Sequence, residues 1–95
     1  MEKIRRVHLI IKGEVQDVGY RAFARRNAQK LKLFGWVKNR YDESVETVVE
    51  GPRDAVEEMV GLLRTGPSFS HITELEFVED VEIQEFRHSD FQVRE

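Results

Sequence analysis

One stretch near the N-terminus constrains the fold more than any other: residues 13–21, with the sequence GEVQDVGYR. An apolar run, Val7 to Ile11, stops just before it, and a helical pattern of apolar residues begins where it ends. These periodicities predict a strand, a loop with a glycine at each end, and a helix whose first turn carries Arg21. Glycine lets backbone N–H groups turn inward, a helix N-terminus presents unpaired donors, and a guanidinium can bind two phosphate oxygens at once. The loop is therefore either an anion site or a plain turn.

The size of the chain fits one domain, residues 1–95, because 95 residues of which 40% are hydrophobic can enclose a single core. Cysteine is absent, which excludes disulfides, thiolate nucleophiles and sulfur-ligated metals. The apolar runs are only a few residues long, and the N-terminal segment lacks the apolar region of a signal peptide. We therefore expect a cytoplasmic protein without a membrane partner, and a monomer is the simplest assembly.

Charge is divided unevenly along the chain. Residues 1–40 carry eleven Lys and Arg against three acidic residues, whereas residues 41–95 carry four against fifteen. The candidate anion loop lies in the basic part. This division is consistent with attraction of a negatively charged ligand, but two elements of one fold can also complement each other electrostatically. We give the second interpretation more weight, because solvated charged faces are common.

Hydrophobic periodicity predicts the element order strand, helix, strand, strand, helix, strand, followed by a short closing strand. The predicted bounds are 5–12, 21–33, 34–40, 45–50, a second helix that starts near Pro52 and ends at Gly66, 72–78 and 91–93. This order is typical of the α+β ferredoxin-like βαββαβ sandwich, with two helices on one face of an antiparallel sheet. Many functions share that fold, so it does not by itself indicate a chemistry.

Several further segments carry a more specific pattern. They are 34–39 (FGWVKN), 42–46 (DESVE), Glu50-Gly51 and Gly66-Pro67. Together with residues 13–21, in this order and spacing, they make the chain resemble the acylphosphatase family over residues 7–93. The resemblance implies the ferredoxin-like sandwich, hydrolysis of the carboxyl-phosphate bond of acyl phosphates, and no required metal or cofactor.

The resemblance also implies a site. The phosphate-binding arginine of the family falls on Arg21, and its water-positioning asparagine falls on Asn39, which would otherwise be interpreted as an ordinary strand-end residue. The backbone N–H groups that would bind the phosphoryl oxygens, or a phosphate or sulfate ion, are those of Val15, Gln16, Asp17, Val18, Gly19 and Tyr20. These residue types suit the chemistry, because an acyl phosphate already has a good leaving group. The protein must mainly neutralise phosphoryl charge and hold a water in line.

Three residues depart from the family pattern at positions where glycine is usual: Asp17, Lys32 and Glu43. A carboxylate about 5–6 Å from the phosphoryl group would oppose binding by roughly 0.7–3 kcal/mol, at the low end if Asp17 points to solvent. Aspartate tolerates a left-handed backbone better than most residues, so we expect the loop shape to survive. Lys32 and Glu43 fall at a helix end and a hairpin turn, where we expect effects on stability more than on catalysis.

Two other functions compete with this interpretation. A domain of the same fold with little or no activity could bind a phosphorylated ligand or a protein partner, with Asp17 as the cause of the lost activity. RNA-recognition motifs share the strand and helix order, but they present aromatic residues on the first and third strands. Neither 7–12 nor 45–50 contains an aromatic residue, so we expect no nucleic acid partner.

The remaining notable polar and aromatic residues are interpreted as structural. His8, His71 and His88 lack the spacing of metal ligands, so we expect no metal site. Asn27 falls within the apolar stripe of the first helix and is expected to find a hydrogen-bond partner. Trp36 is most simply a packing residue.

Overall fold

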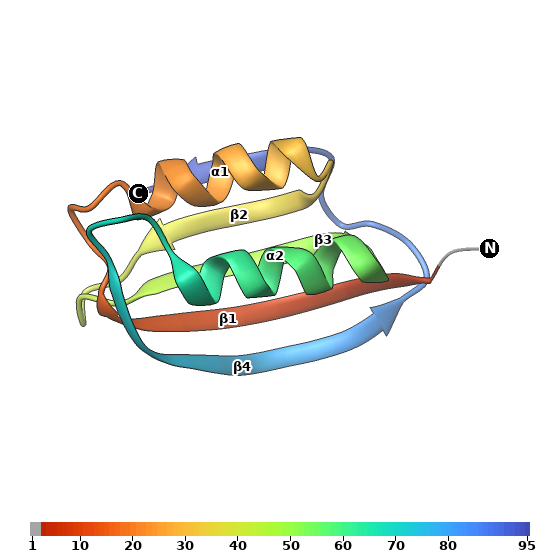
Figure 1. Cartoon of the computed structure of the whole chain (residues 1–95). Coiled ribbons are helices and arrows are strands. Elements are labelled where there is room, and N and C mark those ends of the chain that lie inside the picture. The colour runs from red at the N-terminus through yellow and green to blue at the C-terminus, as the bar shows by residue number, and fades with distance from the viewer. Residues whose placement is uncertain (1–2) are drawn as a thin grey trace.

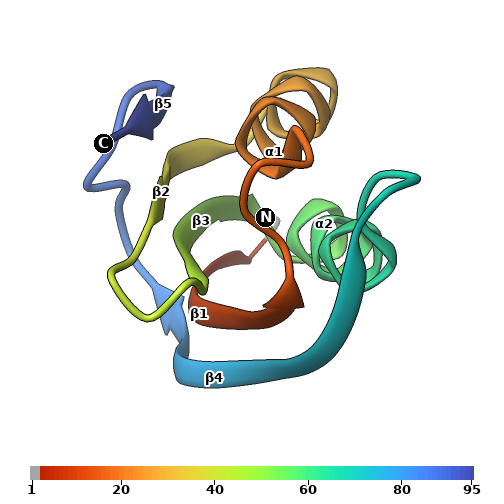
Figure 2. The same cartoon turned by 90° about the vertical axis from the view of Figure 1, so that its left-hand side faces the viewer.

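Seven helices and strands follow one another along residues 3–95, the part of the chain that the computed structural model describes. They are β1 (Ile4–Glu14), α1 (Tyr20–Lys30), β2 (Phe34–Asn39), β3 (Val45–Pro52), α2 (Arg53–Thr65), β4 (His71–Ile83) and β5 (Phe91–Arg94). Both helices lie on the same face of one sheet, as Figures 1 and 2 show from two directions. The predicted ferredoxin-like architecture is confirmed.

The strands form a five-stranded sheet in the order β4-β1-β3-β2-β5. β2 pairs antiparallel with β3, which is the predicted hairpin, and β1 pairs antiparallel with β3 and β4. β5 pairs with β2 in parallel, so the complete sheet is mixed. The parallel pairing is possible because β5 is reached by a long crossing connection, residues 84–90, and not by a hairpin.

Alternating side chains of the strands build the core between the sheet and the helices. Along β1, Val7, Leu9 and Ile11 are fully buried, as their spacing predicts. The helices cover them with buried residues of the predicted apolar stripes, which are Tyr20, Ala24 and Ala28 on α1 and Val56, Met59, Val60 and Leu63 on α2. Asn27 finds its partner within α1, where its amide donates to the carbonyl oxygen of Phe23 at 2.9 Å.

The first helix ends earlier than predicted, at Lys30 and not at residue 33. Lys32 has a left-handed backbone with φ of 58°. The N–H of Lys32 donates to the carbonyl of Gln29 at 3.2 Å, and that of Leu33 to the carbonyl of Ala28 at 2.8 Å. These two hydrogen bonds form a Schellman turn, which usually requires glycine at the left-handed position. The helix stops here because the turn satisfies its last carbonyls.

β4 extends to Ile83, beyond the predicted end at residue 78. Its second half is acidic, with Glu79, Asp80 and Glu82, and it still pairs with β1. β4 is an edge strand that is mostly exposed, so it needs few apolar residues. The alternation of apolar and polar residues therefore stops before the strand itself ends.

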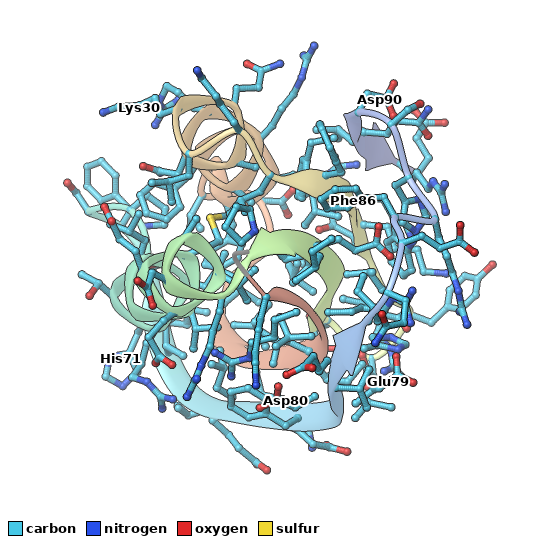
Figure 3. The ribbon with its side chains drawn as sticks, turned by 90° about the vertical axis from the view of Figure 1, so that its right-hand side faces the viewer. Lys30, His71, Glu79, Asp80, Phe86 and Asp90 are labelled. Atoms are coloured by element: carbon cyan, nitrogen blue, oxygen red, sulfur yellow. The ribbon has the colours of Figure 1, made fainter. Side chains whose placement is uncertain are left out.

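The connection between β4 and β5 is held by a buried carboxylate. Glu50 points to the sheet face away from the helices and is fully buried. One of its oxygens accepts from Arg6 Nε at 2.7 Å, and the other accepts from the backbone N–H groups of Arg87 and His88 at 3.0 and 3.2 Å. Phe86, labelled in Figure 3, stacks edge-on against Phe34, with ring centroids 5.1 Å apart. These contacts fix the segment that brings β5 to β2.

Within residues 3–95, no helix is long and apolar enough to cross a lipid bilayer.

Candidate active site

Backbone conformation at the end of β1 and the start of α1 depends on glycine at two positions. Gly13 has φ of 127°, and a Cβ there would lie 2.0 Å from the carbonyl oxygen of His71, so only glycine fits this approach to β4. Gly19 caps α1 with φ of 77° and has no side chain to satisfy the first N–H groups. The first turn of α1 contains no acidic residue. Its free N–H groups and positive dipole end can therefore receive an anion.

The loop is tied to the neighbouring hairpin by the side chain of Gln16. Its Nε2 donates to the carbonyl oxygens of Arg40 at 2.8 Å and Ser44 at 2.9 Å. In the same hairpin, hydrogen bonds from Ser44 hold the pKa of the Asp42 carboxyl below its ordinary value. Gln16 thus fixes the loop beside the end of β2, the strand that carries Asn39.

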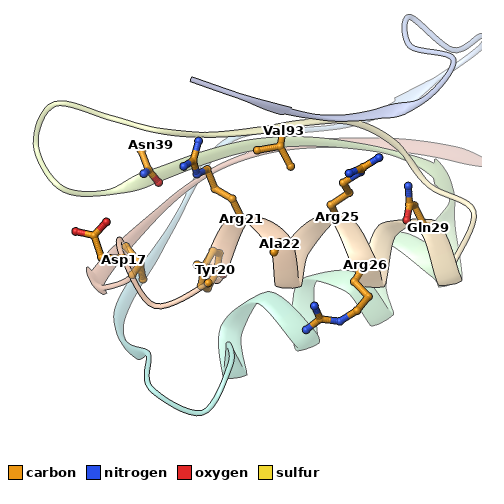
Figure 4. A pocket seen from close by; sticks show the side chains of 11 residues that line it. Asp17, Tyr20, Arg21, Ala22, Arg25, Arg26, Gln29, Asn39 and Val93 are labelled. Carbon is orange, nitrogen blue, oxygen red and sulfur yellow. The ribbon is translucent and has the colours of Figure 1, made fainter.

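A single pocket of about 500 Å³ contains both predicted side chains, Arg21 and Asn39. Arg21 is half-buried on the first turn of α1, and its Nη1 donates to the carbonyl oxygen of Arg94 on β5 at 3.0 Å. Asn39 stands at the end of β2 on the side of Arg21 that faces the loop (Figure 4). The pocket is lined by Val15, Asp17, Gly19, Tyr20, Arg21, Ala22, Arg25, Arg26, Gln29, Asn39 and Val93.

Most of the predicted loop residues line this pocket, but two do not. Gln16 directs its side chain to the hairpin, and Val18 packs against the core. Tyr20 lines the pocket at its base, yet its hydroxyl donates to the carbonyl oxygen of Leu63 at 2.6 Å. Burial raises the pKa of the Tyr20 hydroxyl. That side chain is therefore a core residue, and it cannot serve as a proton donor to a ligand at neutral pH.

Asp17 lies at one end of the pocket, in the loop. Its φ of 64° is left-handed, which agrees with the family's usual glycine there. The residue is exposed, and Figure 4 shows it on the far side of Asn39 from Arg25. Solvent therefore screens its charge, which places its expected effect on anion binding at the low end.

Five residues that line the pocket were not anticipated, namely Ala22, Arg25, Arg26, Gln29 and Val93. The carbonyl of Arg94, which accepts a hydrogen bond from Arg21 but does not line the pocket, was not anticipated either. Every residue has a backbone carbonyl, so the sequence could not indicate that the carbonyl of Arg94 would accept a hydrogen bond from Arg21. Arg25 and Gln29 lie outside the apolar stripe of α1, a position that is usually solvent. Only the placement of β5 beside α1 makes them part of a pocket.

Residues 3–95 hold no group of three or more His, Asp or Glu side chains that could bind a metal ion together. His8 instead makes a 2.6 Å hydrogen bond with Glu46. Trp36, interpreted as a packing residue, lies between two cations, with Lys38 Nζ 5.6 Å and the Arg94 guanidinium 5.1 Å from its ring centroid.

Comparison with known proteins gives one consistent family. A family model described as Acylphosphatase matches residues 7–93. Acylphosphatase of Moorella thermoacetica is 49% identical over 70 residues, which cover 74% of this chain and 75% of the relative. That of Bordetella parapertussis is 44% identical over 82 residues, covering 86% and 87%. The crystal structure of acylphosphatase from Bacillus subtilis matches with a TM-score of 0.85 at 36% identity, covering 96% of this chain and 99% of that one.

Proposed function

The chain belongs to the acylphosphatase family and is an enzyme that hydrolyses acyl phosphates, and we propose that the pocket at the start of α1 is where this hydrolysis occurs. The observation that supports the proposal most strongly is that Arg21 and Asn39, which come from different elements, line one pocket at the N-terminus of a helix. The glycines and the uncapped helix start around the loop also support this location, because they suit an anion site.

In the proposed mechanism, Arg21 and the backbone N–H groups of residues 15–20 bind the phosphoryl oxygens. A guanidinium offers two parallel donors to such a group, and the free N–H groups of the first helical turn add to them. The hydrogen bond from Arg21 to the Arg94 carbonyl supports this role, because it restrains the guanidinium before substrate arrives. A donor that is already oriented costs no reorganisation during the reaction. Inorganic phosphate and sulfate are expected to compete for the same donors.

Asn39 is proposed to position the attacking water. Its amide oxygen can accept a hydrogen bond from the water, and its NH₂ can donate to a neighbouring oxygen as charge develops on it in the transition state. The water oxygen forms the new bond to phosphorus while the bond to the acyl carboxylate breaks, giving carboxylate and inorganic phosphate. A neutral amide suits this task, since a carboxylate would repel the charged substrate.

The experiment that tests the proposal is hydrolysis of benzoyl phosphate by the pure protein without added metal, beside Arg21→Ala. We expect turnover by the parent protein and a loss of about 100- to 1,000-fold in the variant, the usual effect of removing one donor from a developing anion. Arg26→Ala is the matched control, because Arg26 also borders the pocket but extends away from Arg21 (Figure 4). Equal turnover in Arg21→Ala and the parent would refute the assignment.

Asp17 keeps one alternative open, a domain with weak or no activity that binds a phosphorylated ligand or a protein partner. The observation in its favour is that a carboxylate lines the pocket. Because Asp17 is exposed, we expect Asp17→Gly to raise phosphate affinity only about threefold. Activity that appears only in Asp17→Gly would favour the alternative.

We further infer that residues 1–95 act as one domain, because a single buried cluster joins both helices to the sheet. The monomeric state and the cytoplasmic location stay predictions.

A further inference from the structure

The pocket continues past the phosphate-binding residues along α1. Ala22, Arg25 and Gln29 line this extension from the helix, and Val93 lines it from β5. Figure 4 shows Arg25 and Gln29 following Arg21 along the side of α1 that faces β5, with Val93 between the two arginines. We call these four residues the acyl groove. The acyl groove is adjacent to the proposed phosphate site. Ala22 and Val93 give it small or apolar side chains, and Arg25 and Gln29 give it polar ones.

The acyl groove carries positive charge that the described part of the protein does not neutralise. None of the ion pairs within residues 3–95 involves Arg21, Arg25 or Arg26. Of the residues that line the pocket in the described chain, only Asp17 is acidic, and it lies at the opposite end. The charge of Arg25 is therefore available to a ligand.

The geometry of the reaction directs the acyl group into this groove. In an in-line displacement, the attacking water and the leaving oxygen lie on opposite sides of phosphorus. Asn39 stands on one side of the Arg21 guanidinium, and Arg25 stands on the other (Figure 4). If Asn39 holds the water, the leaving carboxylate and the rest of the acyl group extend toward Arg25. Residues four apart on a helix have Cβ atoms about 5–6 Å apart, so Arg25 can reach a group a few bonds beyond the scissile one.

We propose that Arg25 makes the enzyme prefer acyl phosphates whose acyl part carries a second anionic group. The inference rests on the proposed function, because it needs Arg21 to bind the phosphoryl group and Asn39 to hold the water. Ala22 and Val93 contact the carbon skeleton of the acyl part, Gln29 offers an amide, and Arg25 pairs with the second anion. Such a pair in a partly open groove contributes about three- to tenfold in kcat/KM.

The test compares two substrates that differ in charge and little else, 4-carboxybenzoyl phosphate and 4-carbamoylbenzoyl phosphate. The measured quantity is the ratio of their kcat/KM values, charged over neutral. We expect Arg25→Gln to lower this ratio about three- to tenfold, because kcat/KM falls more for the charged substrate than for the neutral one. Arg26→Gln removes the same charge from the next residue, whose side chain extends in the opposite direction, and should change the ratio less than about twofold.

Each other outcome overturns the proposal in a recognisable way. If the ratio falls equally in Arg25→Gln and Arg26→Gln, the preference comes from the overall positive charge of α1. Arg25 would then make no specific contact with the second anion. An unchanged ratio in Arg25→Gln, or equal losses for both substrates, would show that Arg25 does not recognise the second anion. If the parent protein hydrolyses neither substrate, the proposed function itself fails, and this inference fails with it.

Discussion

Replacing Glu50 with alanine should destabilise the protein strongly, although Glu50 does not line the proposed active-site pocket. Its carboxylate is fully buried and accepts three hydrogen bonds, one from the guanidinium of Arg6 and two from backbone N–H groups of the connection to β5. The side chain of Arg6 is only 7% exposed, so its charge would be left in the interior. Arg6 has a second acidic neighbour, Glu79. The Glu79 Oε1 atom lies 3.8 Å from Arg6 Nη1, and the Glu79 side chain is 43% exposed.

The magnitude follows from these contacts. Removing one partner of a buried ion pair costs about 3–5 kcal/mol, and an unsatisfied buried N–H adds about 1–3 kcal/mol unless water reaches it. The connection can loosen and admit water to the N–H groups of Arg87 and His88, so their contribution should be small. We therefore expect the free energy of unfolding to fall by about 3–5 kcal/mol, the cost of the broken ion pair alone. In a domain of this size that lowers Tm by roughly 12–40 °C.

The assay is urea denaturation followed through the single tryptophan, Trp36. Glu57→Ala is the matched control, because Glu57 also pairs with an arginine of β1, Arg5, at 3.0 Å, but its side chain is 72% exposed. Exposed pairs contribute about 0.2–1 kcal/mol, so the control should lose no more than that. If Glu50→Ala and Glu57→Ala differ by less than about 1 kcal/mol, the reasoning about burial is wrong.

Four further substitutions test the left-handed backbone positions, with one control in α1, and a surface ion pair. Lys32→Gly should raise the free energy of unfolding by about 1 kcal/mol, because Lys32 is left-handed at φ of 58°. Lys30→Gly, at the last residue of α1, should instead lower it, by at most about 1 kcal/mol. Glu43→Gly should also stabilise, by a similar amount of about 1 kcal/mol, since its φ is 71°; thermal melting checks all three variants. Hydrogen bonds from Arg5 hold the pKa of Asp80 below its ordinary value, so the stabilisation by this pair is present above that ordinary pKa and is lost as the pH falls through the folded-state pKa. Asp80→Asn should therefore be less stable than the parent at pH 7 by up to about 1 kcal/mol, and urea denaturation should find that this difference shrinks as the pH falls through the folded-state pKa of Asp80; a difference that stays the same as the pH is lowered would contradict the pairing.

The parts of the fold that sequence periodicity predicted are those with a simple alternation or helical stripe. β1 and both helices fall into this class, because their buried residues recur at fixed spacing. The resemblance to a family supplied the roles of Arg21 and Asn39, and the loop pattern supported the first of them independently. That both line one pocket follows from the sheet order, which brings the end of β2 beside the loop.

Features that depend on long-range neighbours were not predictable from local pattern. Glu50 alternates with buried residues of β3, so it reads as a solvent-facing position, and only the crossing of residues 84–90 buries it. The parallel partner of β5 is likewise set by the length of that crossing. Arg25 reads as a solvated helix residue until β5 is placed beside α1. The left-handed backbones of Lys32 and Glu43 agree with the family's glycines at these positions.

Arg21 is proposed to bind the anion and Asn39 to hold the water, and the kinetics of Asn39→Ala separate these two roles. We would measure kcat for benzoyl phosphate together with the inhibition constant of inorganic phosphate. We expect kcat to fall about 100-fold or more while phosphate inhibition stays within about twofold, because Arg21 and the loop still bind the anion. Unchanged kcat, or loss of phosphate affinity together with kcat, would contradict a role for Asn39 in positioning the water.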